Sequence, residues 1–473
     1  MDALNAVVSA INNVLWSYVL IVVLVGCGIW FTLSTRFVQL RMLPEMIRLL
    51  TEGIGHKTEG DAISSFQAFC VSTASRVGVG NIAGVAIAIV TGGPGAVFWM
   101  WAIAFLGCAT GFVESTLAQI YKLPRGNGKF HGGPAYYIKN ALRQPGVAKL
   151  FAFLISVTFG LIYVSVQANT IALSAQTAFG IAPIYSAAFL CVLTALVIFG
   201  GMSRIAKFTE FLVPIMAGIY LLTAFAIILL NIDKVPAMFA LILHDAFSPQ
   251  AAVGGGLGTA VITGVKRGLF SNEAGEGSVP NAAATADVTH PIKQGLVQAF
   301  GVYVDTWIVC SATAFIVLLT GQYMIGGELT GIALAQASLA SIFGPLAPAA
   351  VSILILLFAF SSIVGNYYYG EINIAFFEGN TRKYLLVFRA GVVIMVFFGC
   401  LAELSLVWNL ADLFMGFLCL TNLYAVIRLS KYARIALFDY VKQKKEGHEE
   451  PAFDPAILGD EHGIHAWGVD KIK

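Results

Sequence analysis

Long apolar runs separated by short polar connections are the most regular feature of this sequence. Most runs have about 20 residues or more, the length that a helix needs to cross the hydrocarbon core of a bilayer. A backbone surrounded by lipid must satisfy its own hydrogen bonds, and most runs are too long for barrel strands, so we expect helices. The sequence predicts an all-α integral membrane protein with eleven transmembrane helices, near residues 14–34, 63–91, 94–121, 149–180, 182–201, 208–231, 254–281, 294–321, 342–378, 384–402 and 405–428.

The positions of the basic residues support this segmentation. Nearly all of the 28 Lys and Arg residues lie in alternate connections or in the tail from Arg428. The opposite connections hold only Lys234. Positive residues mark the cytoplasmic side of a membrane protein. We therefore expect the N-terminus outside the cell and the C-terminus in the cytoplasm.

Composition narrows the class of protein further. Hydrophobic residues make up 58% of the chain and charged residues 11%, against roughly 25% charged residues in an ordinary soluble domain. This excludes a soluble enzyme and a disordered protein, and a net charge of +2 gives no basic surface for nucleic acid. The seven cysteines lie in apolar stretches and form no metal-binding spacing. We expect membrane lipid around the protein, no nucleic-acid partner, no bound cofactor and no enzymatic reaction.

Two of the apolar segments are interrupted by Gly and polar residues near the expected bilayer midplane. In both, Arg is followed by Asn five positions later, Ala at seven and Gly at eight: Arg76, Asn81, Ala83 and Gly84 in one, Arg267, Asn272, Ala274 and Gly275 in the other. Close packing of helices through glycine is the alternative reading. It does not explain why polar side chains occur in the same stretches, and these are costly within a membrane.

The two interrupted segments each open a set of five helices, and the charge pattern gives them opposite directions. This predicts an inverted repeat of five plus five helices, preceded by one extra helix. We divide the chain accordingly. Residues 1–62 hold the extra helix and an amphipathic connection, 63–231 the first repeat, 254–428 the second repeat, and 429–473 a cytoplasmic tail. Interrupted helices at matching places in two halves indicate a transporter binding site, because unwound backbone frees amides and carbonyls for a ligand.

Five stretches carry a resemblance to a known family. Residues 268–278 read Gly-Leu-Phe-Ser-Asn-Glu-Ala-Gly-Glu-Gly-Ser, and further matches lie at 78–84, 92–101, 132–137 and 358–366. They are similar to the signature of the alanine or glycine:cation symporter family, and the similarity covers nearly the whole chain. The resemblance implies a LeuT-like fold and sodium-coupled uptake of a small neutral amino acid. It also implies the cytoplasmic (inner) membrane of a bacterium or archaeon.

The resemblance also implies a substrate pocket. The backbone near Gly78 and Gly80 would meet the substrate carboxylate, and the side chains around the substrate would be Gln167, Phe270, Ser271, Asn272, Ser362 and Asn366. Asn366 stands where some family members carry Trp, and Ser362 where others carry Thr. Glutamine is therefore an alternative to alanine and glycine. For Gln167, a hydrogen bond between packed helices is the competing interpretation.

A sodium site is expected where the first interrupted segment faces the ninth one. Sodium prefers oxygen ligands, and the carbonyls of Ala74 and Val77 with the hydroxyls of Ser361 and Ser362 offer four. This set resembles the sodium position of the LeuT-like fold. The alternative is that both serines bond the backbone of their own helix. Proton-coupled transport stays open as well, since the intramembrane acids include Glu114, Asp305, Glu371 and Asp412. A channel is less favoured, because no continuous polar stripe follows several helices.

Overall fold

The computed structural model describes residues 2–53, 62–126, 128–199, 202–248, 258–377, 381–460 and 462–467. Apart from one short antiparallel pair of strands, the regular structure in these ranges is helical. The elements are α1 Asp2–Val14, α2 Ile21–Ser34, α3 Val38–Arg41, α4 Leu43–Gly53, α5 Ser65–Arg76, α6 Val85–Gly92, α7 Gly95–Ile120, β1 Leu123–Pro124, β2 Phe130–His131, α8 Pro134–Asn140, α9 Pro145–Val157, α10 Val164–Phe179, α11 Pro183–Ile198, α12 Met202–Leu230, α13 Val235–Ala246, α15 Thr259–Asn272, α16 Val279–Ala283, α17 Pro291–Val302, α18 Ser311–Thr320, α19 Gly331–Phe343, α20 Ala347–Ile374, α21 Thr381–Leu401 and α22 Leu404–Lys445.

Short π-helical and 3₁₀ turns join several of these helices. The π-helical turns are Leu15–Leu20, Gly80–Gly84, Thr158–Tyr163 and Tyr303–Cys310, and the 3₁₀ turns are Ile232–Lys234 and Pro455–Leu458. The turn at 158–163 makes α9 and α10 one continuous span, and the turn at 303–310 does the same for α17 and α18. Extra residues of this kind inside a helix are frequent at functional positions, because they change which side chains face a neighbour.

The described residues contain seven helices that are long and apolar enough to cross a membrane, or up to nine if each bent pair is one span. One bent pair is α5 with Gly80–Gly92, at 50°, and the other is Pro214–Leu230 with Ile232–Ala246, at 79°. The expected all-helical membrane fold is therefore confirmed. Among the predicted spans, 182–201 corresponds to the shorter helix α11, and 254–281 falls partly outside the described residues.

Three helical regions go beyond the pattern of apolar runs. Helices α13 and α19 occupy stretches that the sequence indicated as connections, and α22 continues to Lys445 although its apolar run ends near residue 428. Helix α19 has 13 residues, which at 1.5 Å per residue is too short to cross the bilayer. The continuation of α22 beyond residue 428 is amphipathic. Its mean hydropathy is therefore low, and hydropathy alone does not distinguish it from a polar tail.

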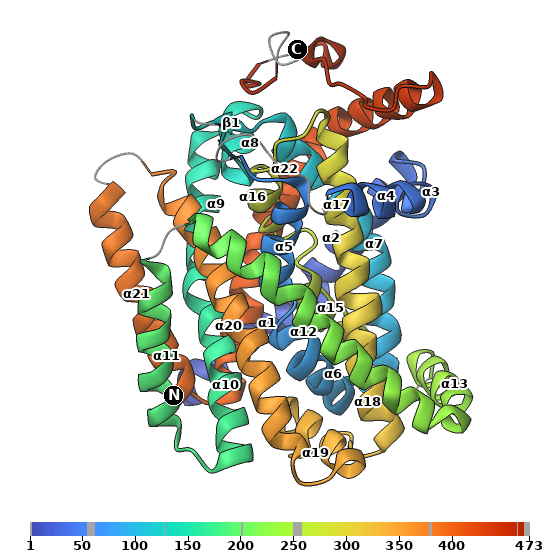
Figure 1. Cartoon of the computed structure of the whole chain (residues 1–473), viewed down its shortest axis with the longest axis vertical. Helices are drawn as coiled ribbons and strands as arrows, with labels where there is room; N and C mark the ends of the chain where they lie inside the picture. The colour runs from blue at the N-terminus through green and yellow to red at the C-terminus, as the bar shows by residue number, and fades with distance from the viewer. Residues whose placement is uncertain are drawn as a thin grey trace.

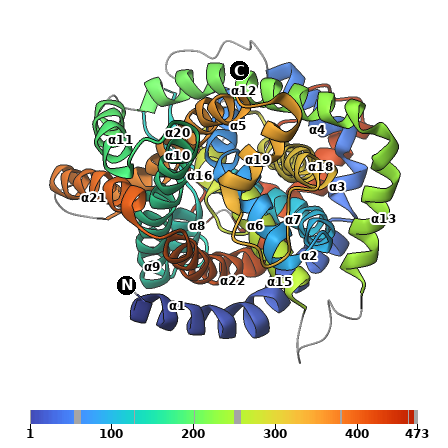
Figure 2. The same cartoon turned by 90° about the horizontal axis from the view of Figure 1, so that it is seen from below.

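The two interrupted segments lie in the middle of the molecule. Figure 2 looks along the long helices and shows α5 and α6 in the centre, with α1, α11, α21 and α13 at the periphery. Helices α7, α10 and α20 run beside them through the length of the molecule (Figure 1). Large apolar side chains such as Leu196 and Leu222 are exposed on the outer helices, as expected of a surface that faces lipid.

Candidate functional site

The first helix break lies between α5 and the π-helical turn that precedes α6. Helix α5 begins with a capping box between Ser64 and Gln67 and ends before Val77, whose ψ of 94° is extended. Two amides freed by the break then find side-chain acceptors. The amide of Gly78 donates to Asn81 Oδ1 at 2.8 Å, and that of Val79 to Gln167 Oε1 at 3.2 Å. The break is thus held by polar side chains that are themselves buried.

The second break follows α15. The chain turns through Glu273, with φ of 57°, and through Gly275 and Gly277, with φ of 99° and 78°. A Cβ at Gly277 would lie 2.8 Å from the side chain of Asn422, so this position requires glycine both for its conformation and for its space. The freed backbone groups of Gly275 are also bound: its amide donates to Glu114 Oε1 at 3.1 Å, and its carbonyl accepts from Asn422 Nδ2 at 2.9 Å.

The two breaks contact each other. A Cβ at Gly80 would lie 3.0 Å from the ring of Phe270 and 3.2 Å from Ser271 Cα. The buried carboxylate of Asp305 joins both segments, because it accepts from Asn81 Nδ2 at 2.6 Å and from Ser271 Oγ at 2.7 Å. Asp305 therefore links the two interrupted segments through a shared carboxyl group.

The expected oxygen ligands also meet. Ser362 Oγ lies 2.9 Å from the carbonyl oxygen of Ala74 and 3.5 Å from that of Val77, and it also lies 3.1 Å from Phe358 O of its own helix. Ser361 Oγ donates to Phe358 O at 2.8 Å. The structure thus brings Ala74, Val77 and Ser362 together, whereas the Ser361 hydroxyl bonds the backbone of its own helix, the alternative raised by the sequence.

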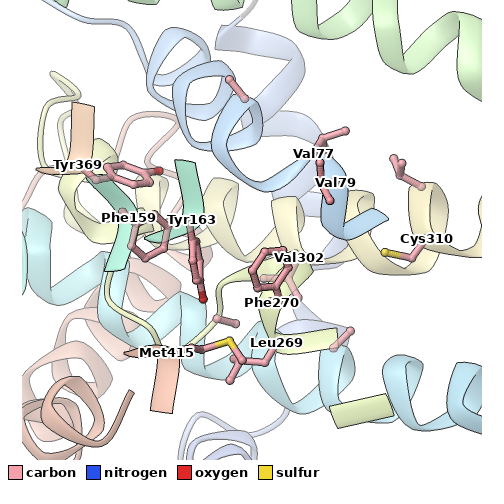
Figure 3. Packing of buried hydrophobic residues seen from close by; sticks show 14 of the residues in the cluster. Val77, Val79, Phe159, Tyr163, Leu269, Phe270, Val302, Cys310, Tyr369 and Met415 are labelled. Carbon is pink, nitrogen blue, oxygen red and sulfur yellow. The ribbon is translucent and has the colours of Figure 1, made fainter. Parts of the chain in front are cut away.

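An aromatic group closes one side of the site. The ring of Phe270 lies 4.7 Å from that of Tyr163 and 4.7 Å from that of Trp408, measured between centroids. Figure 3 shows Tyr163 between Phe270 and Phe159. These rings come from three different helical segments and are buried, so Phe270 packs among aromatic side chains on this side.

Asn366 contributes a polar edge on α20. Ser75 Oγ lies 2.7 Å from Asn366 Oδ1 and 2.7 Å from Glu273 Oε1. The amide nitrogen of Asn366 is buried and has no hydrogen-bond partner in the described part of the chain. Unpaired buried donors are rare in folded proteins, and this one lies beside both helix breaks.

The side-chain amide of Asn272 bonds within the second interrupted segment and to the π-helical turn Tyr303–Cys310. Its Nδ2 donates to Thr306 Oγ1 at 3.2 Å and its Oδ1 accepts from the amide of Ala274 at 3.0 Å. Sequence reasoning also missed Tyr163, Trp408 and Asn422, which contact the breaks from other helices. No local motif marks them, since their role comes from packing between distant segments.

The intramembrane basic residues do not share one kind of partner. Arg267 forms an ion pair with Asp412 and stacks on Trp408, with its guanidinium carbon 4.4 Å from the ring centroid. Lys266 Nζ lies 3.6 Å from the same carboxyl group. Arg76 instead donates to the carbonyl and the side-chain oxygen of Gln298, at 3.3 and 3.2 Å. One of the acids singled out in the sequence is thus paired with Arg267.

Of the other acids, Glu371 pairs with Arg389 at 3.0 Å. Within the ranges that the structure covers, Glu114, Glu273, Glu276 and Asp305 are buried and have neutral hydrogen-bond donors in place of an ion pair.

The chain is similar to known transport proteins over nearly its whole length. The chain is 50% identical over 470 residues to a probable sodium/glutamine symporter of Bacillus subtilis, covering 99% of this chain and 97% of that protein. It is 39% identical to a sodium/proton-dependent alanine carrier protein of Bacillus sp. strain PS3, covering 90% and 100%. A crystal structure of a manganese transporter variant from Eremococcus coleocola has the same fold, with a TM-score of 0.51, 12% identity, and coverage of 86% of this chain and 93% of that chain.

The likeness to a transporter with 12% identity supports a LeuT-like chain path and nothing further. The model of one family matches residues 1–455, and this family consists of transporters rather than enzymes. That match and the 50% identical relative together establish membership. This multi-pass membrane protein therefore belongs to the sodium:alanine symporter family.

Proposed function

We propose that the protein couples inward sodium movement to the uptake of a small neutral amino acid by alternating access. The observation that carries the proposal is the contact between the two helix breaks at Gly80 and Phe270–Ser271. Unwound backbone in the middle of a membrane provides amides for a carboxylate and carbonyls for a cation. A zwitterion leaving water needs partners at both ends, which the freed amides and carbonyls of the two breaks would provide.

The amino acid is proposed to bind between the breaks. Its carboxylate would take over amide donors near Gly78 and Gly80, including the Val79 amide that Gln167 now accepts from. Ser271, Asn272, Ser362 and Asn366 would surround it, with Phe270 as the apolar wall. Alanine and glycine are the proposed substrates from the family, with glutamine as the alternative. The 50% identical relative named for glutamine and the unpaired amide of Asn366 favour including it.

Sodium is proposed to bind between α5 and α20. The carbonyls of Ala74 and Val77 and the hydroxyl of Ser362 already converge there, and Ser361 lies next along the same helix. A cation that holds both segments would favour one arrangement of the bundle, and so would link ion binding to substrate binding.

The full topology belongs to the proposal as well. We infer eleven spans arranged as five plus five after one extra helix, with residues 429–473 in the cytoplasm and the N-terminus outside. The segregation of the 28 basic residues supports this orientation. The protein would lie in the cytoplasmic membrane of a bacterium or archaeon, in contact with lipid.

Reconstituted uptake tests the proposed function. Labelled alanine, glycine and glutamine are offered to proteoliposomes under an imposed sodium gradient, and separately under a proton gradient without sodium. We expect concentrative uptake of at least one of the three with sodium. Equilibration without a sodium gradient, or uptake that follows the proton gradient alone, would contradict sodium coupling.

The sodium site has its own test. Ser362→Ala is expected to raise the sodium concentration for half-maximal uptake more than Ser361→Ala does, because only the Ser362 hydroxyl contacts the carbonyls of α5. The double variant should resemble Ser362→Ala. Equal sodium dependence in the parent and in the double variant would place the ion elsewhere.

A further inference from the structure

Four buried carboxyl groups near the breaks differ in the hydrogen bonds that they receive. Asp305 accepts hydrogen bonds from three donors. Glu114 and Glu273 each accept two hydrogen bonds, one on each carboxyl oxygen. Glu276 accepts one bond only among the described residues, from Tyr163 Oη to Oε2 at 3.0 Å. Its Oε1 is buried and has no partner there. Glu276 is therefore the least stabilised of the four as an anion.

The surroundings of Glu276 also disfavour a negative charge. The groups that face it are Glu273 of its own loop, Glu114 of α7, Cys419 of α22 and the phenol of Tyr163. Two of these are carboxyl groups and none is a cation. An ionised Glu276 would be a buried charge beside like charges, an arrangement that proteins avoid by neutralising the group.

Glu276 lies between two segments whose relative movement would depend on its charge. It is on the break between α15 and α16, while Tyr163 belongs to the continuous span 145–179. Glycines with positive φ flank Glu276 on both sides, at Gly275 and Gly277. If the broken segment moves away from this span, Glu276 loses Tyr163 and meets water, where a carboxyl group ionises.

We propose that Glu276 is a proton-binding site whose proton stabilises the closed arrangement of the two breaks. The inference rests on the proposed function, because it assumes that the broken segments move during transport. It adds a second ion to the cycle: the acid is neutral when the site is closed and releases its proton when the site opens. Closure, and therefore uptake, should be lost as the pH rises.

The experiment measures sodium-driven uptake by proteoliposomes as a function of pH. For the parent protein, we expect a plateau at low pH and a decline above a transition, by up to about tenfold for each pH unit, the limit for a single proton. Glu276→Gln mimics the protonated acid, so its uptake should stay level through that range. Glu371→Gln is the control, because Glu371 is paired with Arg389 on other helices, and it should keep the parent profile.

Tyr163→Phe gives a second readout that a merely structural role would not move. Loss of its hydroxyl removes the one donor to Glu276, so the proton is held to higher pH and the transition should shift upward by about one pH unit. A flat parent profile would overturn the proposal. So would a Glu276→Gln profile that follows the parent, or, where that variant does not fold, an unshifted transition in Tyr163→Phe. Failure of the proposed function would appear separately, as no sodium-driven uptake by the parent at any pH.

Discussion

The absence of a side chain at Gly78 allows three segments to meet. A Cβ there would lie 2.2 Å from Ser362 Oγ, closer than real contacts come, and 3.1 Å from Gln167 Oε1, which is tighter than most contacts. Glycine therefore lets α5, α10 and α20 approach the same stretch of backbone. Its flexibility is useful in addition, because Val77 and Val79 on either side belong to extended and helical backbone, respectively.

Gln167 is the side chain whose removal should weaken substrate binding most directly. Gln167→Ala removes a polar side chain that lies at the Val79 amide and would bond the charged substrate once its carboxylate has taken that amide, a loss of about 1.5–3 kcal/mol for a hydrogen bond to a charged group. Binding of the transported amino acid should weaken roughly ten- to a hundredfold, as measured by calorimetry on purified protein. Gln176→Ala, on the exposed end of the same helix, is the matched control. Unchanged affinity in Gln167→Ala would show that the amide only holds the break.

For individual residues, the sequence predicted which ones lie at the helix breaks better than it predicted which atoms they contact. The break near Ala74–Gly80 and its approach to Ser362 could be expected, because glycine spacing and hydroxyls within an apolar run are visible in one dimension. The Asn272 contacts with Thr306 and Ala274 could not, since they depend on which way α15 is rotated. Packing of side chains decides that rotation.

Among the elements, α4 is joined to the end of α22 by the half-buried carboxylate of Glu45. Tyr440 Oη donates to Glu45 Oε1 at 2.5 Å, and Arg48 Nε donates to Glu45 Oε2 at 2.8 Å. Burial acts to raise the pKa of Glu45, but these hydrogen bonds outweigh it and leave the pKa below its ordinary value. The folded protein thus holds this proton less tightly than the unfolded chain does.

We expect Glu45→Gln to lower the melting temperature of the detergent-solubilised protein at neutral pH. A depressed carboxyl pKa stabilises the fold above the unfolded pKa, about 4.3 for Glu, and this contribution is lost as the pH falls through the lower folded value. The difference between parent and variant should therefore shrink in acid. Glu52→Gln, which alters a more exposed partner of Arg48, should have little effect. A difference that persists unchanged in acid would exclude the ion pair as its cause.

The elements that hydropathy missed have a common physical reason. Helix α13 and helix α19 are shorter than a span, and their neighbours in sequence include Gly, Pro and acidic residues that resemble a connection. Apolar runs identify helices whose whole length lies in the hydrocarbon core of the membrane, where the side chains must be apolar. They do not identify short helices that pack at the ends of others, because a partly polar surface is allowed there.

For the whole molecule, the orientation can be tested by cysteine labelling. Glu328 and Glu446 are exposed at opposite sides of the proposed membrane, and the native cysteines are buried or half-buried. Cysteine at position 328 should react with an impermeant maleimide in intact cells, and cysteine at 446 only after permeabilisation. The reverse pattern would invert the topology and remove the support that the basic residues give to it.

The single carboxylate shared by the two breaks has a consequence for how the family can vary. Asp305 receives hydrogen bonds from Asn81 of the first interrupted segment and from Ser271 of the second, so neither segment can alter its polar contact there without changing what is left for the other. Substitutions at 81 and 271 should then be epistatic. Loss of either donor should be harmful alone, and the cost of losing both should differ from the sum of the two single costs, because both donors serve one buried carboxylate.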